Sequence, residues 1–360
     1  MKNNLILAID TSCDDTSVAV TSGKYVLSNI IASQTELHKQ YGGVFPTVAK
    51  QAHKEQILPA ILIALKRAGA NWQDMAAVAV TQGPGLAPAL EVGIATAKRL
   101  SSKHQIPLIP VNHLEGHVLS VLAQPKPQNV PWQKLDTLLP QTKNSLSILV
   151  SGGNTLFVKT VKIGKYKVLG QTLDDAAGEC LDKIGRMLNL GYPAGPVIEQ
   201  FAKLGDPKAV PFPLPLTMTK TYDLSFSGLK TAARNLLEEN GVLKPLEKQA
   251  VYDFCASIQF AVFRHITYKL NKLLVDHEFS QIWLGGGVAA NATLRRMIRE
   301  TIRTNAGRVQ NPKLAVPYSK KLCMDNAAMI GVVASYKPTQ KTDSEKIERR
   351  PRWGLGELKG

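Results

Sequence analysis

The chain has 360 residues, 44% of them hydrophobic, and a formal net charge of +16 at pH 7. This length can form two lobes with separate cores. The basicity favours a polyanionic partner such as nucleic acid, with solubility as the alternative explanation. No apolar run approaches the roughly 20 residues that cross a membrane, and the apolar start is too short for a signal peptide, so we expect neither.

The cysteines indicate a reduced, intracellular protein. They are widely spaced and form no C-x-x-C motif, and they are Cys13, Cys180, Cys255 and Cys323. Disulfide frameworks are typical of short secreted chains with many cysteines. We therefore expect a cytoplasmic location.

The first predicted elements are two strands with a polar bend between them. Residues 5–9 form an apolar run that predicts a buried strand, and residues 17–21 continue as a second strand. Hydroxyl and backbone N–H groups at such a bend can face a phosphate, and ordinary turn chemistry is the alternative for its acids. The polar residues of the bend are Thr11, Ser12, Asp14 and Asp15.

Helices and strands then alternate. The chain is expected to form a loop over residues 34–45, a helix over 47–68, a strand over 76–81 and a helix from 88 to about 103. His53 lies on the first of these helices and is expected at its surface.

Two histidines on one predicted helix form the first candidate site. Residues 106–111 predict a strand, after which Asn112 is in position to cap a helix. His113 and His117 are four residues apart, so they lie one helical turn apart and can share a metal ion. Glu115 lies two positions from each and points away from the metal. Chance spacing of the two histidines is the alternative.

A metallopeptidase is the rival function for such a pair. Peptidases of the H-E-x-x-H kind need an acid directly after the first histidine. Leu114 stands there, which argues against a peptidase.

The second half of the chain repeats the strand–turn–strand pattern. A proline-rich connector over residues 123–145 leads into a strand over 146–150, a turn with Gly152 and Gly153, and a strand over 156–161. The backbone N–H groups of such a glycine turn can hold an anion, although many plain hairpins look alike.

Helices dominate the rest of this half. Asp174 and Asp175 are expected to open a helix with an acidic, solvated face that includes Asp182. A further helix start near residue 228 is expected to be capped by Ser225 or Ser227. A long helix over about 246–274 follows, and then a strand over 282–284.

A third glycine turn precedes a basic helix. Residues 285–287 are all glycine, and the helix after them begins near Asn291. A glycine turn at a helix N-terminus is a ready anion or nucleotide site, here including Gly286. The basic residues of this helix and just beyond it favour a nucleic-acid contact over a solvated face, and they are Arg295, Arg296, Arg299, Arg303 and Arg308.

The chain closes with a short helix and a basic tail. Residues 324–337 predict the helix, with Asp325 as its default N-cap. The tail over residues 338–360 carries Arg349, Arg350 and Arg352, and it is a second candidate for nucleic-acid contact.

Three anion-binding turns from two similarly built halves are expected of two lobes that close on a nucleotide. The order of these turns resembles the actin/heat-shock-protein-70/sugar-kinase superfamily. That resemblance implies an α/β protein with a two-lobed actin-like ATPase fold, in which each lobe is a mixed sheet with flanking helices. The N-lobe would comprise residues 1–122 with the returning helix 324–337, and the C-lobe residues 146–323.

A narrower resemblance rests on a set of motifs. These are IDTSCDDTS, YGGVFP, GPGL, NHLEGH, LVSGGNT, DDAAGECLDKIGR, SFSGLKT, GGGVAAN and MDNAAMIG. Together they resemble the tRNA threonylcarbamoyladenosine-synthesis transferase family over residues 5 to about 353. Members move a threonylcarbamoyl group from threonylcarbamoyl-AMP to the exocyclic amine of the adenosine beside the anticodon.

The resemblance implies roles for named residues. His113, His117 and Asp325 would hold one divalent metal ion, iron first and zinc second. Asp14 or Asp15 would accept the amine proton. The substrate- or nucleotide-binding positions would be Thr11, Ser12, Leu149, Val150, Ser151, Gly152, Gly153, Asp182, Gly195, Gly286 and Asn291.

The chain departs from the family pattern at several positions. Asp15 stands where the family usually has Glu, Asn154 where it usually has His, and Met324 where Thr is common. The metal and glycine-turn positions are retained, so the resemblance still implies activity.

The resemblance also implies partners. They are tRNA and, for a bacterial member, a small paralogue and a small ATPase. A non-catalytic nucleotide-binding partner of the same superfamily is a further alternative, but such partners in this pathway lack the two-histidine helix.

Overall fold

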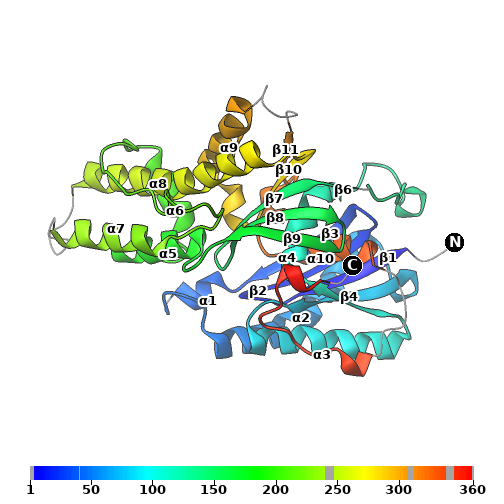
Figure 1. The fold of residues 1–360 in the computed structure, drawn as a ribbon. Coiled ribbons are helices and arrows are strands. Elements are labelled where there is room, and N and C mark those ends of the chain that lie inside the picture. Colours follow the sequence, from blue (N-terminus) through cyan, green and yellow to red (C-terminus); the bar gives the residue numbers. More distant parts are fainter. Residues whose placement is uncertain are drawn as a thin grey trace. The chain divides into compact units, whose positions relative to one another are not determined.

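The structure is a computed structural model that describes residues 4–39, 41–140, 142–239, 247–305, 312–337 and 344–358. The chain divides into two compact units, each built of helices packed on one sheet (Figure 1). Unit 1 comprises Met1–Thr142, Lys162–Tyr166 and Val316–Gly360, and unit 2 comprises Lys143–Val161 and Lys167–Ala315. The predicted α/β class is confirmed.

The sheet of unit 1 brings three strand ends to one edge. Its order is β5-β4-β1-β2-β3-β6. Strand β1 pairs parallel with β4, and β4 pairs parallel with β5, so all three end at the same edge. The strands are β1 Leu5–Asp10, β2 Asp15–Ser22, β3 Tyr25–Ser33, β4 Met75–Gly83, β5 Leu108–Asn112 and β6 Gln124–Pro125.

Helices cover both faces of this sheet. The odd-numbered apolar residues of β1 belong to the core beneath α2 (Pro46–Ala68) and α3 (Ala87–His104). On the other face, Ser17 of β2 accepts a hydrogen bond from the first amide of α10 (Ala327–Ser335). Helix α10 also contacts α4 (His113–Leu119), the helix of the two histidines.

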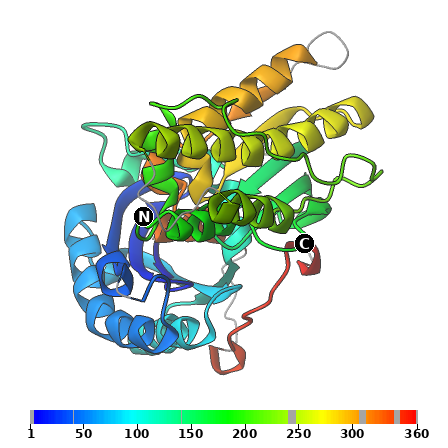
Figure 2. The same cartoon turned by 90° about the vertical axis from the view of Figure 1, so that its left-hand side faces the viewer.

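Unit 2 has a five-stranded sheet in the order β11-β10-β7-β8-β9. Its central strand β7 pairs parallel with β10 and antiparallel with β8. The long helix α8 contacts α6 and α9, and α5 contacts α7, as Figure 2 shows from the side of these helices. The strands are β7 Ser145–Val150, β8 Thr155–Lys162, β9 Lys165–Gln171, β10 Gln281–Gly285 and β11 Lys313–Ala315, and the helices are α5 Ala177–Met187, α6 Gly195–Ala202, α7 Ser227–Glu239, α8 Lys248–Asp276 and α9 Ala292–Thr304.

Several expectations about single elements were wrong. The predicted loop over residues 34–45 contains helix α1 (Thr35–Lys39). His53 is fully buried rather than at the surface, because its ring bonds to Thr16 and to the carbonyl of Cys13. Strands β3 and β9 were not expected.

Two predicted helix starts were also wrong. Asn326, and not Asp325, caps α10, and its side chain accepts from the amide of Met329. Helix α5 begins at Ala177, because Asp174 instead accepts hydrogen bonds at the start of α7.

The described helices include none that is long and apolar enough to cross a bilayer.

Candidate functional site

The common edge of the three parallel strands in unit 1 carries the candidate metal site. Strand β5 ends at Asn112, whose side-chain oxygen accepts from the amides of Leu114 and Glu115 and so caps α4. With Asn112 as the cap, the helix begins at His113, and His113 and His117 lie one turn apart on the same side of it. Asp325 arrives from the other end of the chain, directly before the cap of α10.

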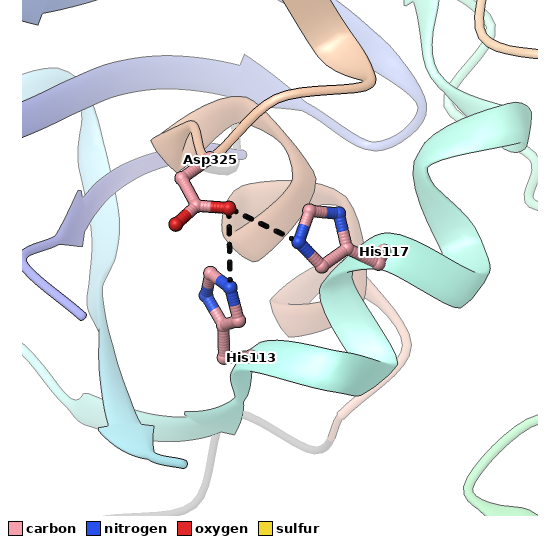
Figure 3. A group of neighbouring side chains, drawn as sticks. All are labelled: His113, His117 and Asp325. Carbon is pink, nitrogen blue, oxygen red and sulfur yellow. Dashed lines mark hydrogen bonds and ion pairs between the residues drawn. The ribbon is translucent and has the colours of Figure 1, made fainter. Parts of the chain in front are cut away.

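The two imidazoles and the carboxylate converge. The ligand atoms of His113, His117 and Asp325 all lie within 4.8 Å of one another (Figure 3). Nε2 of His113 lies 3.4 Å and Nε2 of His117 lies 3.2 Å from the same oxygen, Oδ1 of Asp325. Both imidazoles are buried, while the Asp325 side chain is 29% exposed. These three residues therefore form a possible metal site that is open on the carboxylate side.

The far side of the His113 ring is held in place. Its Nδ1 lies 3.0 Å from Oγ of Ser12 and 3.5 Å from a carboxylate oxygen of Asp10, both buried. Histidine ligands of metals usually bond through their second nitrogen in this way, which fixes the tautomer. Nδ1 of His117 has no such partner among the described residues.

The electrostatics of the site favour a cation. Burial alone would lower the pKa of His113, but the carboxylates of Asp325 and Asp10 outweigh burial and raise the pKa to about 10. For Asp325 the effects are reversed: burial alone would raise its pKa, but the neighbouring His113 and His117 lower it. Where no metal is present, a proton on His113 supplies the positive charge that the two acids attract. The donor set and its charge thus fit a divalent metal ion.

Glu115 takes no part in this site. Its carboxylate accepts a hydrogen bond of 2.9 Å from the hydroxyl of Tyr166 and forms an ion pair of 3.4 Å with Lys337. Both partners belong to unit 1. The expectation that Glu115 points away from the imidazoles is confirmed.

The side chains of the polar bend after β1 make hydrogen bonds that the sequence did not indicate. The hydroxyl of Thr11 donates to the carbonyl of Ala89 in α3, and that of Ser12 contacts His113. Asp14 ends the bend, and Asp15 is the first residue of β2. Burial raises the pKa of Asp14, and it raises the pKa of Asp15 to about 7.

In unit 2, the glycine turn after β7 lies against two other turns. A Cβ on Gly178, in the first turn of α5, would lie 2.7 Å from the carbonyl of Ser151. A Cβ on Gly286 would lie 2.4 Å from the carbonyl of Val150, and Gly286 has a φ of +90° that favours glycine. Gly152 and Gly153 themselves are exposed, with open space beside them. The two glycine-rich turns and a helix N-terminus are therefore neighbours.

The other predicted binding residues of unit 2 hold turns in place. Oδ1 of Asp182 accepts from the amides of Ala194 and Gly195, at 2.8 and 3.1 Å. It is thus more than a member of a solvated face. Asn291 caps α9, and its amide donates to Gln259 of α8 at 2.7 Å.

Some of the arginines expected to contact nucleic acid have partners within the protein. Arg295 donates to the carbonyl of Ala289, whereas three arginines of α9 have exposed side chains: Arg296, Arg299 and Arg303. Arg308 lies outside the described residues. In the tail, Arg349 pairs with Glu91 and Arg350 with Glu357.

Sequence reasoning missed the contact of Asp10 with His113. The one available signal was an acid at the end of a buried strand, which is an unusual place for an unpaired charge. The partner lies about a hundred positions away, so the sequence alone does not identify it.

Comparisons with known proteins give a consistent result. A family model described as "TsaD: tRNA N6-adenosine threonylcarbamoyltransferase" matches residues 25–332. A curated protein of that name from Acaryochloris marina is 43% identical over 330 residues, covering 90% of this chain and 86% of its own. Another from Clostridioides difficile is 42% identical over 337 residues, covering 93% and 94%.

Solved structures are similar in fold at low sequence identity. HypF from T. kodakarensis has a TM-score of 0.56 at 13% identity, covering 92% of this chain and 48% of its own. The activator of 2-hydroxyisocaproyl-CoA dehydratase from Clostridium difficile has a TM-score of 0.50 at 13% identity, covering 92% and 94%. These similarities confirm the expected actin-like fold class.

Proposed function

Because the chain belongs to the family of tRNA N6-adenosine threonylcarbamoyltransferases, we propose that it moves a threonylcarbamoyl group from threonylcarbamoyl-AMP to the N6 amine of adenosine in tRNA. The acceptor is the adenosine beside the anticodon, in tRNAs that read codons beginning with A. A carbon–nitrogen bond forms, the bond from the acyl carbon to the phosphate oxygen breaks, and AMP leaves. The observation that carries the proposal is the convergence of His113, His117 and Asp325.

We further propose that these three residues hold one iron(II) ion, with zinc as the second choice. Two imidazoles and one carboxylate with open positions are typical of mononuclear iron(II) sites, and similar sets bind catalytic zinc. A metal bound there would polarise the carbonyl of the donor. Ser12 and Asp10 would keep His113 in the tautomer that presents Nε2 to the metal.

The remaining chemistry is positioning and proton transfer. The donor is already an activated mixed anhydride, so no covalent enzyme intermediate is needed. Asp15 would accept the proton lost by the amine, a role supported by its pKa of about 7, close to the working pH of a general base. Asp14 is the alternative acceptor.

In unit 2, the exposed amides of the turn with Gly152 and Gly153 would bind the adenylate phosphate. This assignment is supported by the neighbouring N-terminus of α5, whose dipole favours anions. Leu149, Val150 and Ser151 would support this turn, and Gly286 would let the third turn approach it. Asp182, Gly195 and Asn291 would complete the nucleotide site.

The alternative of a metallopeptidase has no support. The only acid on α4 is Glu115, and its carboxylate is taken by Tyr166 and Lys337. The matching family and relatives are transferases. The two-histidine helix likewise argues against a non-catalytic partner.

We also propose partners and a location. Arg296, Arg299 and Arg303 of α9 and the arginines of the tail would contact tRNA phosphates. A small paralogue and a small ATPase would complete the transfer machinery. The protein would work in the cytoplasm, where its tRNA substrate is found.

The test is a reconstituted reaction. The protein is incubated with tRNA, ATP, threonine, bicarbonate and the other pathway proteins, and the nucleosides are analysed by mass spectrometry. We expect threonylcarbamoyladenosine with the unaltered protein. We also expect it with the control His104→Ala, because the His104 ring stacks on Trp72 and has no part in the proposed site. We expect none with His117→Ala, although its circular dichroism should be unchanged. Full activity of His117→Ala would remove the metal from the mechanism, and peptide cleavage without modified nucleoside would overturn the proposed function.

A further inference from the structure

The C-terminal part of unit 1 contains a segment that lies against the edge of the sheet near the candidate metal site. We call residues 348–353 the strap. The side chain of Gln82, near the end of β4, donates to the carbonyl of Glu348, and the carbonyl of Gln82 accepts from the amide of Arg350. The amide of Gly85 donates to the carbonyl of Pro351. The strap is therefore bonded along its length to the turn that follows β4.

Close packing reinforces these bonds. A Cβ on Gly83 would lie 1.9 Å from the carbonyl oxygen of Arg350, so the position accepts only glycine while the strap is in place. Trp353, at the end of the strap, is only 8% exposed, and the guanidinium of Arg350 lies 4.4 Å from the centre of its ring. Trp353 thus anchors the strap by burial of its ring.

The strap ends on the N-cap of the histidine helix. The side-chain amide of Asn112 donates to the carbonyl of Trp353 at 3.0 Å, while the oxygen of the same side chain caps α4. Asn112 is fully buried. The bond to Trp353 fixes the orientation of the Asn112 amide, and so it fixes the cap of the helix that begins at His113.

A second connection reaches the other side of the same imidazole. The carbonyl of Ser12 accepts from the amide of Leu86, and a Cβ on Gly85 would lie 2.5 Å from that carbonyl. The hydroxyl of Ser12 contacts Nδ1 of His113. The turn under the strap therefore also holds the residue that orients the ring.

We propose that the strap and Asn112 are positioning residues for the metal centre: the buried ring of Trp353 holds the strap, the strap holds the Asn112 amide, and Asn112 sets the position of His113. This inference rests on the proposed metal site. Changes to partners behind a metal ligand typically weaken metal binding about 10- to 100-fold.

The test measures the affinity of the metal-free protein for cobalt(II) alone, through the visible absorption of the bound ion. Asn112→Ser keeps a good capping oxygen but loses the donor to Trp353, and Trp353→Ala loses the anchor. We expect each to weaken cobalt binding about tenfold. Trp353→Phe should bind as the unaltered protein does, because the indole N–H has no partner in the part of the chain that is described.

A double variant distinguishes positioning from general damage. If Asn112 and Trp353 act through the same contact, the two substitutions should not add. The double variant Asn112→Ser/Trp353→Ala should then bind cobalt with the affinity of whichever single variant binds it more weakly. The control Asn71→Ser changes a capping asparagine of the helical turn Trp72–Asp74 and should leave the affinity unchanged. Thermal unfolding of the metal-free proteins reports any separate loss of stability.

The outcomes separate two failures. Unaltered affinity in Asn112→Ser or in Trp353→Ala would overturn the positioning role while leaving the metal site intact, and so would losses that multiply in the double variant. Cobalt binding by Trp353→Phe that is as weak as binding by Trp353→Ala would also count against the role. If the unaltered protein itself binds no cobalt, the proposed metal site fails, and the inference fails with it.

Discussion

The candidate metal site shows how one residue acquires its role from residues far away in the chain. Alone, His113 is a buried imidazole at the start of a short helix. Asp325 on one side and Ser12 with Asp10 on the other give its two nitrogens different tasks. Nε2 lies beside the Asp325 carboxylate and Nδ1 is held by Ser12 and Asp10, which is the usual arrangement of a histidine that binds a metal.

Asp15 should make the stability of the protein depend on pH. Burial raises its pKa from 3.8 to about 7 in the folded state, so between these values the folded protein binds more protons than the unfolded chain. Stability should therefore fall as pH rises from about 4 to 7. Asp15→Asn should remove this loss, on the order of 2 kcal/mol once partial exposure is considered.

Urea unfolding of metal-free protein at pH 4.5 and pH 7.5 measures the effect of Asp15→Asn. Asp136→Asn is the control, because Asp136 is exposed. A pH dependence identical in Asp15→Asn and the unaltered protein would show that burial of Asp15 is not costly. The same variant tests proton acceptance, since Asn cannot take up the amine proton and transfer should be lost.

At the scale of elements, the start of α7 depends on a carboxylate from another segment. Asp174 accepts hydrogen bonds from the amides of Phe226 and Ser227 and from the hydroxyls of Ser225 and Ser227. The serines were expected to cap this helix, but they are donors to its actual cap. The helix start and the segment before α5 are thus fixed together.

Removing this cap should destabilise unit 2. We expect Asp174→Ala to lower the free energy of unfolding by about 1–2 kcal/mol, because two helix amides and two hydroxyls lose a charged acceptor. Asp206→Ala is the matched control, since among the described residues the Asp206 carboxylate accepts only from the backbone amide of Lys208. Equal losses in the two variants, measured by urea unfolding, would contradict the capping role.

Helix α2 presents exposed apolar side chains, and we predict that the proposed small paralogue binds there. Leu58 and Leu62 lie one turn apart and are 45% and 67% exposed. We expect Leu62→Asp to change the stability by less than about 0.5 kcal/mol, as surface substitutions do, yet to weaken association with the partner proteins at least tenfold. Gel filtration and calorimetric titration against the small paralogue measure this association.

The control for this surface is Met218→Asp. Met218 is 94% exposed and belongs to unit 2, so the substitution adds a charge elsewhere. Association that survives Leu62→Asp, or that Met218→Asp weakens equally, would show that α2 is not the docking surface.

At the scale of the whole molecule, the sequence predicted what depends on local pattern. Apolar runs located the strands β1, β4, β7 and β10, and four-residue spacing located the histidine pair. Contacts between distant segments were not predictable from local pattern, and the approach of Asp325 to the histidine pair followed only from the family resemblance. Asn112 bonds to Trp353 across 241 positions, and Ser17 bonds to the start of α10 across 310.

The same limit explains the wrong expectations. His53 follows the helical pattern of a surface residue, yet Thr16 and Gln34 surround its ring and bury it. A capping residue for α10 was expected at Asp325, but the aspartate is drawn to the imidazoles and the next residue caps the helix. In each case a tertiary contact outweighs the local preference.

The location of all three proposed ligands in unit 1 leads to a prediction for the whole chain. Metal bound at these residues stabilises only conformations in which unit 1 is folded, by about 2.7 kcal/mol at a hundredfold excess over its dissociation constant. Opening of α4 or α10 to exchange would also separate the metal ligands. Bound metal should therefore slow hydrogen exchange in these two helices. Exchange in α9 of unit 2 should change little. Mass spectrometry with and without cobalt(II), and with His117→Ala as the control that binds no metal, measures both regions. Equal protection of α4 and α9, or protection that persists in His117→Ala, would place the metal elsewhere.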